Sequence, residues 1–268
     1  SVGLGAHDAQ TFLKRASSDL LHKLASVQFQ PGEVPVHLIA VGCTEAYGPN
    51  RNGDGFREPV CRLTHPTFVK FAHFFRGHKS RPTDPRYGSV KLSYYNDVMR
   101  RIELVVGLFG DEACARRNDG HVADIELRKL AAAQDVPTSM GCAVPYDVCS
   151  GCGNKAKTRE FYCDARMCKA GGLKYNMGQL LPDGSILHAD NTEPRFNDIS
   201  HVPRQADRIS YVLGLMQKAA GTGRAPIVSG AELAELFYPA DSTSKWAKMA
   251  AKLADVEADG LDKYLGLA

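Results

Sequence analysis

GSVKLSYYNDVMRRIELVVGLF, residues 88–109, is the stretch that decides the fold class. It predicts two strands, over residues 88–95 and 100–109, because β-branched, aromatic and other apolar residues dominate both runs. Consecutive strands without an intervening helix argue against a doubly wound parallel sheet. The stretch therefore favours an α+β protein, with a mixed or antiparallel sheet or barrel and flanking helices.

The same patterns extend outward to the rest of the chain. Further strands are predicted over residues 34–41, 137–144 and 196–202. Helices are predicted over residues 9–26, 65–75, 121–134, 206–219, 230–238 and 243–266. We expect an N-terminal helical segment (1–34), a core (35–218) with an insert at 145–175, and a linker with a C-terminal helical extension (219–268).

Composition excludes several classes of protein. The 268 residues carry 33 Lys+Arg and 30 Asp+Glu, a formal charge of +3, which is too small to indicate nucleic-acid binding by itself. No apolar run approaches the roughly 20 residues of a membrane span. The first residues lack the basic and apolar regions of a signal peptide. We therefore expect a globular protein, and the clustering of its cysteines together with the missing export signal favours a reducing compartment.

Four of the eight cysteines lie within twenty residues, as Cys149-x2-Cys152 and Cys163-x4-Cys168. Such pairs on tight turns bring thiolates to one tetrahedral ion, so the spacing predicts structural zinc. Four protein thiolates leave no open position, which argues against a catalytic metal. The alternative is reduced, unliganded thiols or a single disulfide.

A second motif begins like a calcium loop. Asn50-x-Asn52-x-Asp54-Gly55 matches the start of that pattern, but Cys61 stands at the twelfth position, where the pattern requires a bidentate Glu. We therefore interpret this segment as a structured turn.

Three polar residues could be catalytic or structural when each is considered alone. His78 follows Phe-Phe-Arg-Gly before a turn, His201 lies in an apolar strand, and Ser139 precedes Met-Gly. A lone histidine is more often structural than catalytic. Ser139 does not sit in the Gly-x-Ser-x-Gly elbow of the hydrolases.

Taken in order, three blocks resemble the head maturation (prohead) proteases of tailed bacteriophages, which share the fold of the herpesvirus assembly proteases. The blocks are His78-Lys79 with Tyr87-Gly88-Ser89-Val90, then Thr138-Ser139-Met140-Gly141, then Phe196-Asn197-Asp198-Ile199-Ser200-His201-Val202 followed by Ala206-Asp207. The order His, Ser, acid is that of the family and differs from other serine hydrolases. The cysteine block resembles the Cys-Ser-x-Cys-Gly-Asn insert of a phage subset.

The resemblance implies a mostly antiparallel closed β-barrel with flanking helices and a serine endopeptidase activity. It implies Ser139 as nucleophile and His78 as general base. Asp198 stands where many members have Glu, and His201 is the rival third member, as in the herpesvirus enzymes. The amides of Met140 and Gly141 are the candidate oxyanion donors.

The resemblance also implies a biological setting. Its substrates would be the major capsid and scaffold proteins, with the portal as a further partner, and its herpesvirus relatives act as dimers. The setting would be the phage procapsid or virion, assembled in the bacterial host cytoplasm. We expect the zinc-ordered insert to brace the wall of the substrate cleft.

Two other hypotheses about function remain open. One is a catalytically silent, protease-like structural protein of the virion, capsid or portal associated, stapled by zinc. The other is a nucleic-acid-binding zinc protein, suggested by basic residues around the cysteines. These are Lys155, Lys157, Arg159, Arg166 and Lys169.

Overall fold

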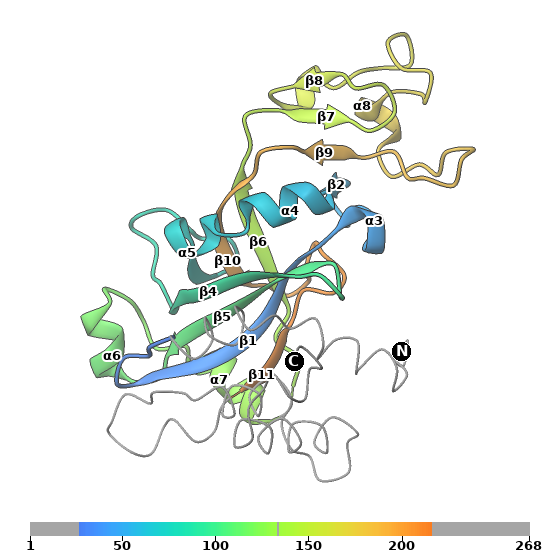
Figure 1. Ribbon diagram of the computed structural model, residues 1–268. Helices are drawn as coiled ribbons and strands as arrows, with labels where there is room; N and C mark the ends of the chain where they lie inside the picture. The colour runs from blue at the N-terminus through green and yellow to red at the C-terminus, as the bar shows by residue number, and fades with distance from the viewer. Residues whose placement is uncertain (1–26, 133, 216–268) are drawn as a thin grey trace.

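A curled seven-stranded sheet forms the centre of the computed structural model, which describes residues 27–132 and 134–215 (Figure 1). The strand order is β11-β1-β5-β4-β3-β10-β6. The bounds are β1 Glu33–Gly42, β3 His73–Arg76, β4 Gly88–Asn96, β5 Arg101–Phe109, β6 Thr138–Ala143, β10 Arg195–His201 and β11 Val212–Leu215. The helices predicted over 9–26, 230–238 and 243–266, and the extension over 219–268, lie outside the described residues.

The fold class is α+β, as predicted, but the sheet is a mixed half-barrel and not the closed antiparallel barrel that we expected. β3 and β10 run parallel, with Asp198 opposite His73, while every other neighbouring pair in this sheet is antiparallel. A parallel pair needs a long crossover, and residues 77–194 lie between these two strands. Within the described residues, the edge strands β6 and β11 approach each other where Pro137 bridges Tyr211.

The strands predicted from residues 88–109 are confirmed and form one hairpin, in which Asn96 is opposite Arg101. Two other predictions were wrong. The helix predicted over 65–75 ends at Phe71, and β3 begins at His73. Residues 212–215 form β11 where a helix was predicted over 206–219, because they pair with the edge of β1.

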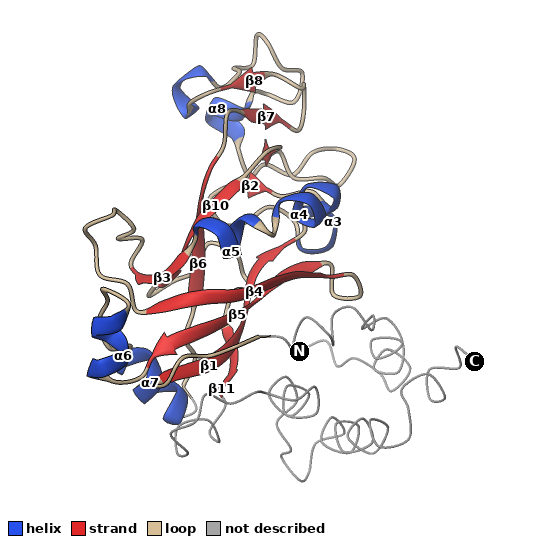
Figure 2. Ribbon diagram, turned by 60° about the vertical axis from the view of Figure 1, so that its left-hand side comes forward, coloured by secondary structure: helices blue, strands red, loops and turns tan. Residues whose placement is uncertain are grey.

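Short helices cover the sheet and its ends (Figure 2). They are α3 Thr44–Tyr47, α4 Glu58–Thr64, α5 Thr67–Phe71, α6 Glu112–Arg117 and α7 Asp124–Ala131. None of the helices within the described ranges is long and apolar enough to cross a membrane.

The main core lies between the inner face of the sheet and helices α4 and α5. Alternate residues of β1, among them Val36 and Leu38, are fully buried there. The rings of Phe68 on α5 and Phe196 on β10 stack with centroids 4.3 Å apart. This packing fixes β10 against α5 and so positions the strand that carries Asp198.

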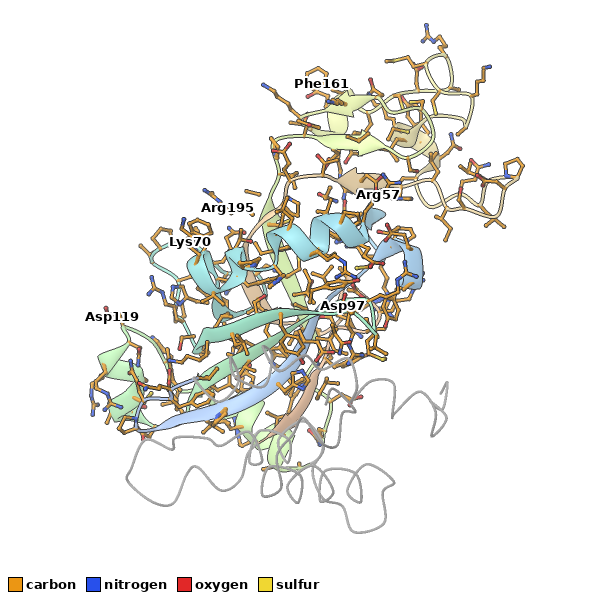
Figure 3. The ribbon with its side chains drawn as sticks, in the orientation of Figure 1. Arg57, Lys70, Asp97, Asp119, Phe161 and Arg195 are labelled. Atoms are coloured by element: carbon orange, nitrogen blue, oxygen red, sulfur yellow. The ribbon has the colours of Figure 1, made fainter. Side chains whose placement is uncertain are left out.

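A second, smaller unit stands at one end of the molecule, and we call residues 147–191 the insert (Figure 1). Its sheet has the order β2-β9-β7-β8, with β2 Asp54–Gly55 supplied by the core, β7 Asp147–Cys149, β8 Lys155–Ala156 and β9 Ala189–Asn191. A 3₁₀ helix, η1 Arg159–Phe161, and helix α8 Leu173–Asn176 complete it. Phe161 lies at its outer end, while Arg57 of the core lies beside β9 (Figure 3).

Candidate active site and metal centre

His78 sits on a tight turn directly after β3. Gly77 and His78 both have left-handed backbones, with φ of 61° and 58°. This conformation is unfavourable for a residue with a Cβ, although His tolerates it better than most. The turn is held by two bonds to β10: Gly77 N donates to His201 O at 2.8 Å, and His78 N donates to Ser200 Oγ at 3.2 Å.

Asp198 on β10 holds the imidazole. Its Oδ2 lies 2.7 Å from His78 Nδ1, and its Oδ1 accepts a hydrogen bond from Ser200 Oγ at 2.7 Å. The Asp198 side chain is 2% exposed, whereas that of His78 is 43% exposed. With Asp198 ionised, Nδ1 carries the ring proton, so Nε2 is left as the acceptor that a general base requires.

Ser139 lies on β6 and faces the same side of the sheet. It is opposite Ser200 in the antiparallel register, and Gly141 is opposite Asp198. Side chains opposite one another in such a pair share a face. The structure thus brings together three of the predicted residues, His78, Ser139 and Asp198.

A cleft of about 500 Å³ gives access to this arrangement. It is lined by Arg51, Asn52, Gly77, His78, Ser139, Val202, Pro203, Arg204, Gln205 and Ala206. Within the described part of the chain, the Ser139 hydroxyl makes no hydrogen bond to the imidazole. Such bonds are often long in free enzymes and tighten when substrate binds.

His201 is held by a different set of groups. Its Nδ1 donates to Glu126 Oε1 at 2.7 Å, and Lys129 Nζ lies 3.2 Å from its Nε2. Glu126 also accepts from Arg76, with Nη2 at 2.6 Å. Burial would raise the pKa of Glu126, but the bonds from His201 and Arg76 outweigh it and lower this pKa to about 2. His201 therefore contributes its main-chain carbonyl to the His78 turn, while its ring binds α7.

Met140 and Gly141 lie inside the β6–β10 pairing, opposite Ile199 and Asp198. A Cβ on Gly141 would stand 3.1 Å from the Asp198 side chain. Close packing against the acid is thus one reason for a glycine here, and the role of the two amides as oxyanion donors stays a prediction.

Sequence reasoning missed Ser200, Arg76 and Glu126. The alternation of β10 could have revealed Ser200, because residues two apart on a strand share a face and Asp198 was already a candidate. Glu126 contacts Arg76 because α7 packs on the sheet, so no local sequence pattern predicts this ion pair.

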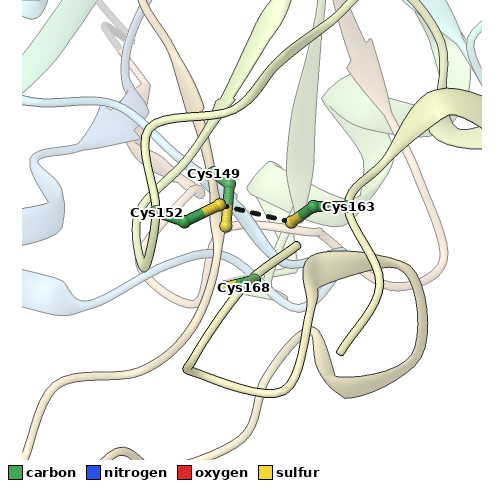
Figure 4. Close-up of side chains that lie close together, drawn as sticks. All are labelled: Cys149, Cys152, Cys163 and Cys168. Atoms are coloured by element: carbon green, nitrogen blue, oxygen red, sulfur yellow. Dashed lines mark hydrogen bonds between the residues drawn. The ribbon is translucent and has the colours of Figure 1, made fainter. Parts of the chain in front are cut away.

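The four clustered cysteines meet in the insert (Figure 4). The sulfur atoms of Cys149, Cys152, Cys163 and Cys168 all lie within 4.8 Å of one another, and Cys152 Sγ is 3.6 Å from Cys163 Sγ. A tetrahedral ion with Zn–S bonds of about 2.3 Å needs sulfurs about 3.8 Å apart. All four are free thiols. The cluster is therefore compatible with a zinc site.

The surroundings of these sulfurs also fit a bound cation. Leu173 N donates to Cys163 Sγ at 3.3 Å, the kind of support that orients metal ligands. Burial raises the pKa of Cys149, Cys152 and Cys163, whereas at Cys168 the bonds from the main-chain amides of Gly172 and Ala170 help to outweigh burial and lower the pKa. A divalent ion supplies the positive charge that buried thiolates require.

Comparison with family models, with curated proteins and with solved structures finds no match to this chain. What these residues do must therefore be inferred from their own geometry.

Proposed function

We propose that this protein is a serine endopeptidase. The observation that carries the proposal is the contact of 2.7 Å between His78 Nδ1 and the buried Asp198, in a cleft also lined by Ser139. A serine hydroxyl becomes a useful nucleophile only when a positioned base takes its proton. A buried carboxylate that fixes the tautomer of that base completes the set of groups required for acyl transfer.

The reaction would proceed in two stages. Ser139 Oγ attacks the scissile carbonyl carbon as its proton passes to His78 Nε2, and the tetrahedral intermediate collapses when the C–N bond breaks and the imidazolium protonates the leaving amine. Water, deprotonated by His78, then attacks the acyl-enzyme and releases the acid and free Ser139. Asp198 keeps its charge throughout and stabilises the imidazolium.

We further propose the substrates and setting that the sequence resemblance implies. These are phage capsid and scaffold proteins, cleaved during head maturation inside a procapsid, with the portal as a further partner and a homodimer as the assembly. The support is the order of the three motif blocks, together with the cleft that His78 and Ser139 line and the contact between His78 and Asp198. The metal is proposed to be zinc with a structural role, because four cysteines leave no position for substrate.

The test is covalent labelling by a fluorophosphonate, a probe that needs an activated serine but no knowledge of the substrate. We expect mass spectrometry to find the adduct on Ser139 and labelling to vanish in Ser139→Ala. Ser185→Ala is the matched control, because the Ser185 hydroxyl donates to Asp183 Oδ1 in an exposed turn of the insert. An unlabelled Ser139, in a folded protein that keeps its metal, would refute the proposal.

One observation favours the structural alternative, a silent protease-like virion protein stapled by zinc. Ser139 is only 5% exposed and makes no bond to His78 within the described residues. Such a protein would stay in mature heads in stoichiometric copies, whereas a maturation protease would be lost or fragmented. Quantitative mass spectrometry of purified heads distinguishes the two.

A further inference from the structure

One wall of the cleft is a loop that contacts both the core and the insert. The core holds it at Arg51, whose N donates to Ala206 O at 2.9 Å and whose Nη1 donates to Gln205 O at 2.7 Å. Residues 48–55, here called the cleft loop, place Arg51 and Asn52 in the lining beside His78 and Ser139. The loop closes on itself through Asn50, whose side-chain oxygen accepts from Asn52 N at 2.8 Å and from Asp54 N at 3.0 Å. This turn uses the Asn50 oxygen that a calcium ion would need, which agrees with the interpretation as a structured turn.

The insert binds the main chain of the cleft loop. The end of the loop is strand β2, which pairs in parallel with β9, and Ala189 N donates to Gly53 O at 2.9 Å. Asn191 Nδ2 donates to Gly55 O at 3.4 Å. β2 has only two residues, so the insert supplies the sheet in which it lies.

Two side chains of the insert add to these contacts. Arg159 Nη2 reaches Asn52 O at 3.3 Å and Asp54 Oδ1 at 3.4 Å. Met177 fills the space beside Gly53, where a Cβ would stand 2.4 Å from Met177 Cγ. The exposed ion pair of Arg159 contributes little alone, so the attachment of the loop depends on all these contacts acting together.

The segments that hold the loop are those that the four cysteines would join through a metal. Arg159 lies in η1, just before Cys163, and Met177 follows α8, whose first amide bonds the sulfur of Cys163. Three of the eight buried residues in the small core of the insert are cysteines: the core comprises Cys149, Ala156, Tyr162, Cys163, Cys168, Leu173, Leu187 and Ala189, with Cys152 at its edge. A core this small is not expected to order the insert without a cross-link.

We propose that the metal centre positions the part of the cleft loop that follows Arg51, and hence Asn52, through Arg159, Met177 and the β2–β9 pairing. Metal binding would order the insert, and the insert would fix one wall of the cleft. Arg159 and Met177 are positioning residues in this scheme, since they touch the loop and not the reacting atoms. The effect on substrate rests on the proposed function, whereas the effect on the loop does not.

Hydrogen exchange of the full-length protein tests the link without any substrate. Removal of the metal by a chelator should speed exchange of the amides of Asn50 and Gly53, which bond within the loop, at least about tenfold, which corresponds to the loss of one ordinary hydrogen bond. Amides of β4 and β5 should keep their protection. Unchanged exchange in the loop, or equal loss of protection in β4 and β5, would overturn the proposal.

A double variant removes the side-chain contacts between the insert and the cleft loop without removing the metal ligands. Arg159→Ala with Met177→Ala should keep the metal content and speed exchange in the cleft loop, and chelation should then add little. Arg166→Ala with Leu180→Ala is the matched control, because both side chains are exposed on the insert, Arg166 at 93% and Leu180 at 68%. Equal exchange in the double variant and the control would also overturn the proposal.

Activity gives a second readout if the fluorophosphonate labels Ser139. Because Arg51 and Asn52 line the cleft without touching the reacting atoms, the double variant should raise KM for a peptide substrate several-fold and change kcat little. An unlabelled Ser139 would refute the protease and leave the exchange result standing, so the two failures are distinguishable.

Discussion

Replacement of Glu126 by Gln should remove a large part of the acid sensitivity of this fold. The Glu126 carboxylate is fully buried, and it binds Arg76 and His201 at 2.6 and 2.7 Å. These bonds join α7 to β3 and β10, the two strands that carry the His78 turn and Asp198. An amide in place of the carboxylate keeps the shape and removes the charge.

The size of the effect follows from the pKa of Glu126, which is lowered from 4.5 to about 2. A shift of that size is worth about 3 kcal/mol, at about 1.4 kcal/mol for each pH unit. A depressed carboxyl pKa stabilises the fold above the unfolded pKa, and this contribution is lost as the pH falls through the folded value. The stabilisation of the fold by ionised Glu126 is therefore fully present at pH 7, and about 2 kcal/mol of it is lost by pH 3.

Urea unfolding followed by circular dichroism, at pH 7 and at pH 3, measures this directly. The wild type should exceed Glu126→Gln by about 3 kcal/mol at pH 7 and by about 1 kcal/mol at pH 3. Glu112→Gln is the control, because Glu112 is 76% exposed and lies 3.9 Å from its partner Arg116. An equal dependence on pH in the wild type and in Glu126→Gln would refute the reasoning.

Three further predictions concern the site and the core. Asp198→Asn should slow labelling of the nucleophile by about 10⁴-fold, because an amide no longer selects the required tautomer of His78; labelling at the wild-type rate would contradict this role. Arg204→Ala should lower kcat/KM about tenfold for peptides with an acidic residue near the scissile bond and leave neutral peptides unchanged, because no acidic side chain is among the described residues that line the cleft. Phe196→Ala should cost about 3–5 kcal/mol in urea unfolding through loss of its stack on Phe68, and an unchanged midpoint would show that the core refills.

Local patterns predicted the parts of this molecule that local chemistry determines. The hairpin over residues 88–109 followed from its apolar runs, and the cysteine cluster followed from its spacing. In both cases the deciding residues are near neighbours in the sequence.

The features that sequence reasoning missed depend on contacts between distant segments. β3 has only four residues, directly after a helix, and it exists because β4 and β10 flank it. β11 likewise takes its conformation from β1 and not from the helical pattern of its own residues. The partner of His201 could not be foreseen, since Glu126 reaches it only once α7 has packed.

The candidate triad residues were found through the resemblance and not through the physics of single residues. A lone Ser139 or His78 carries no distinctive signal, and their meeting depends on the register between β6 and β10. Gly141 illustrates the limit, because its packing against Asp198 appears only in three dimensions.

The parallel pairing of β3 with β10 also orders events in time. During synthesis His78 and Ser139 leave the ribosome well before Asp198, and the insert is made between Ser139 and Asp198. Asp198 can contact His78 only after the intervening chain has been synthesised and β10 has paired with β3. If the proposed protease function holds, a nascent or half-folded chain would therefore contain Ser139 and His78 without the carboxylate that orients the imidazole, and it would be inactive until the sheet is complete.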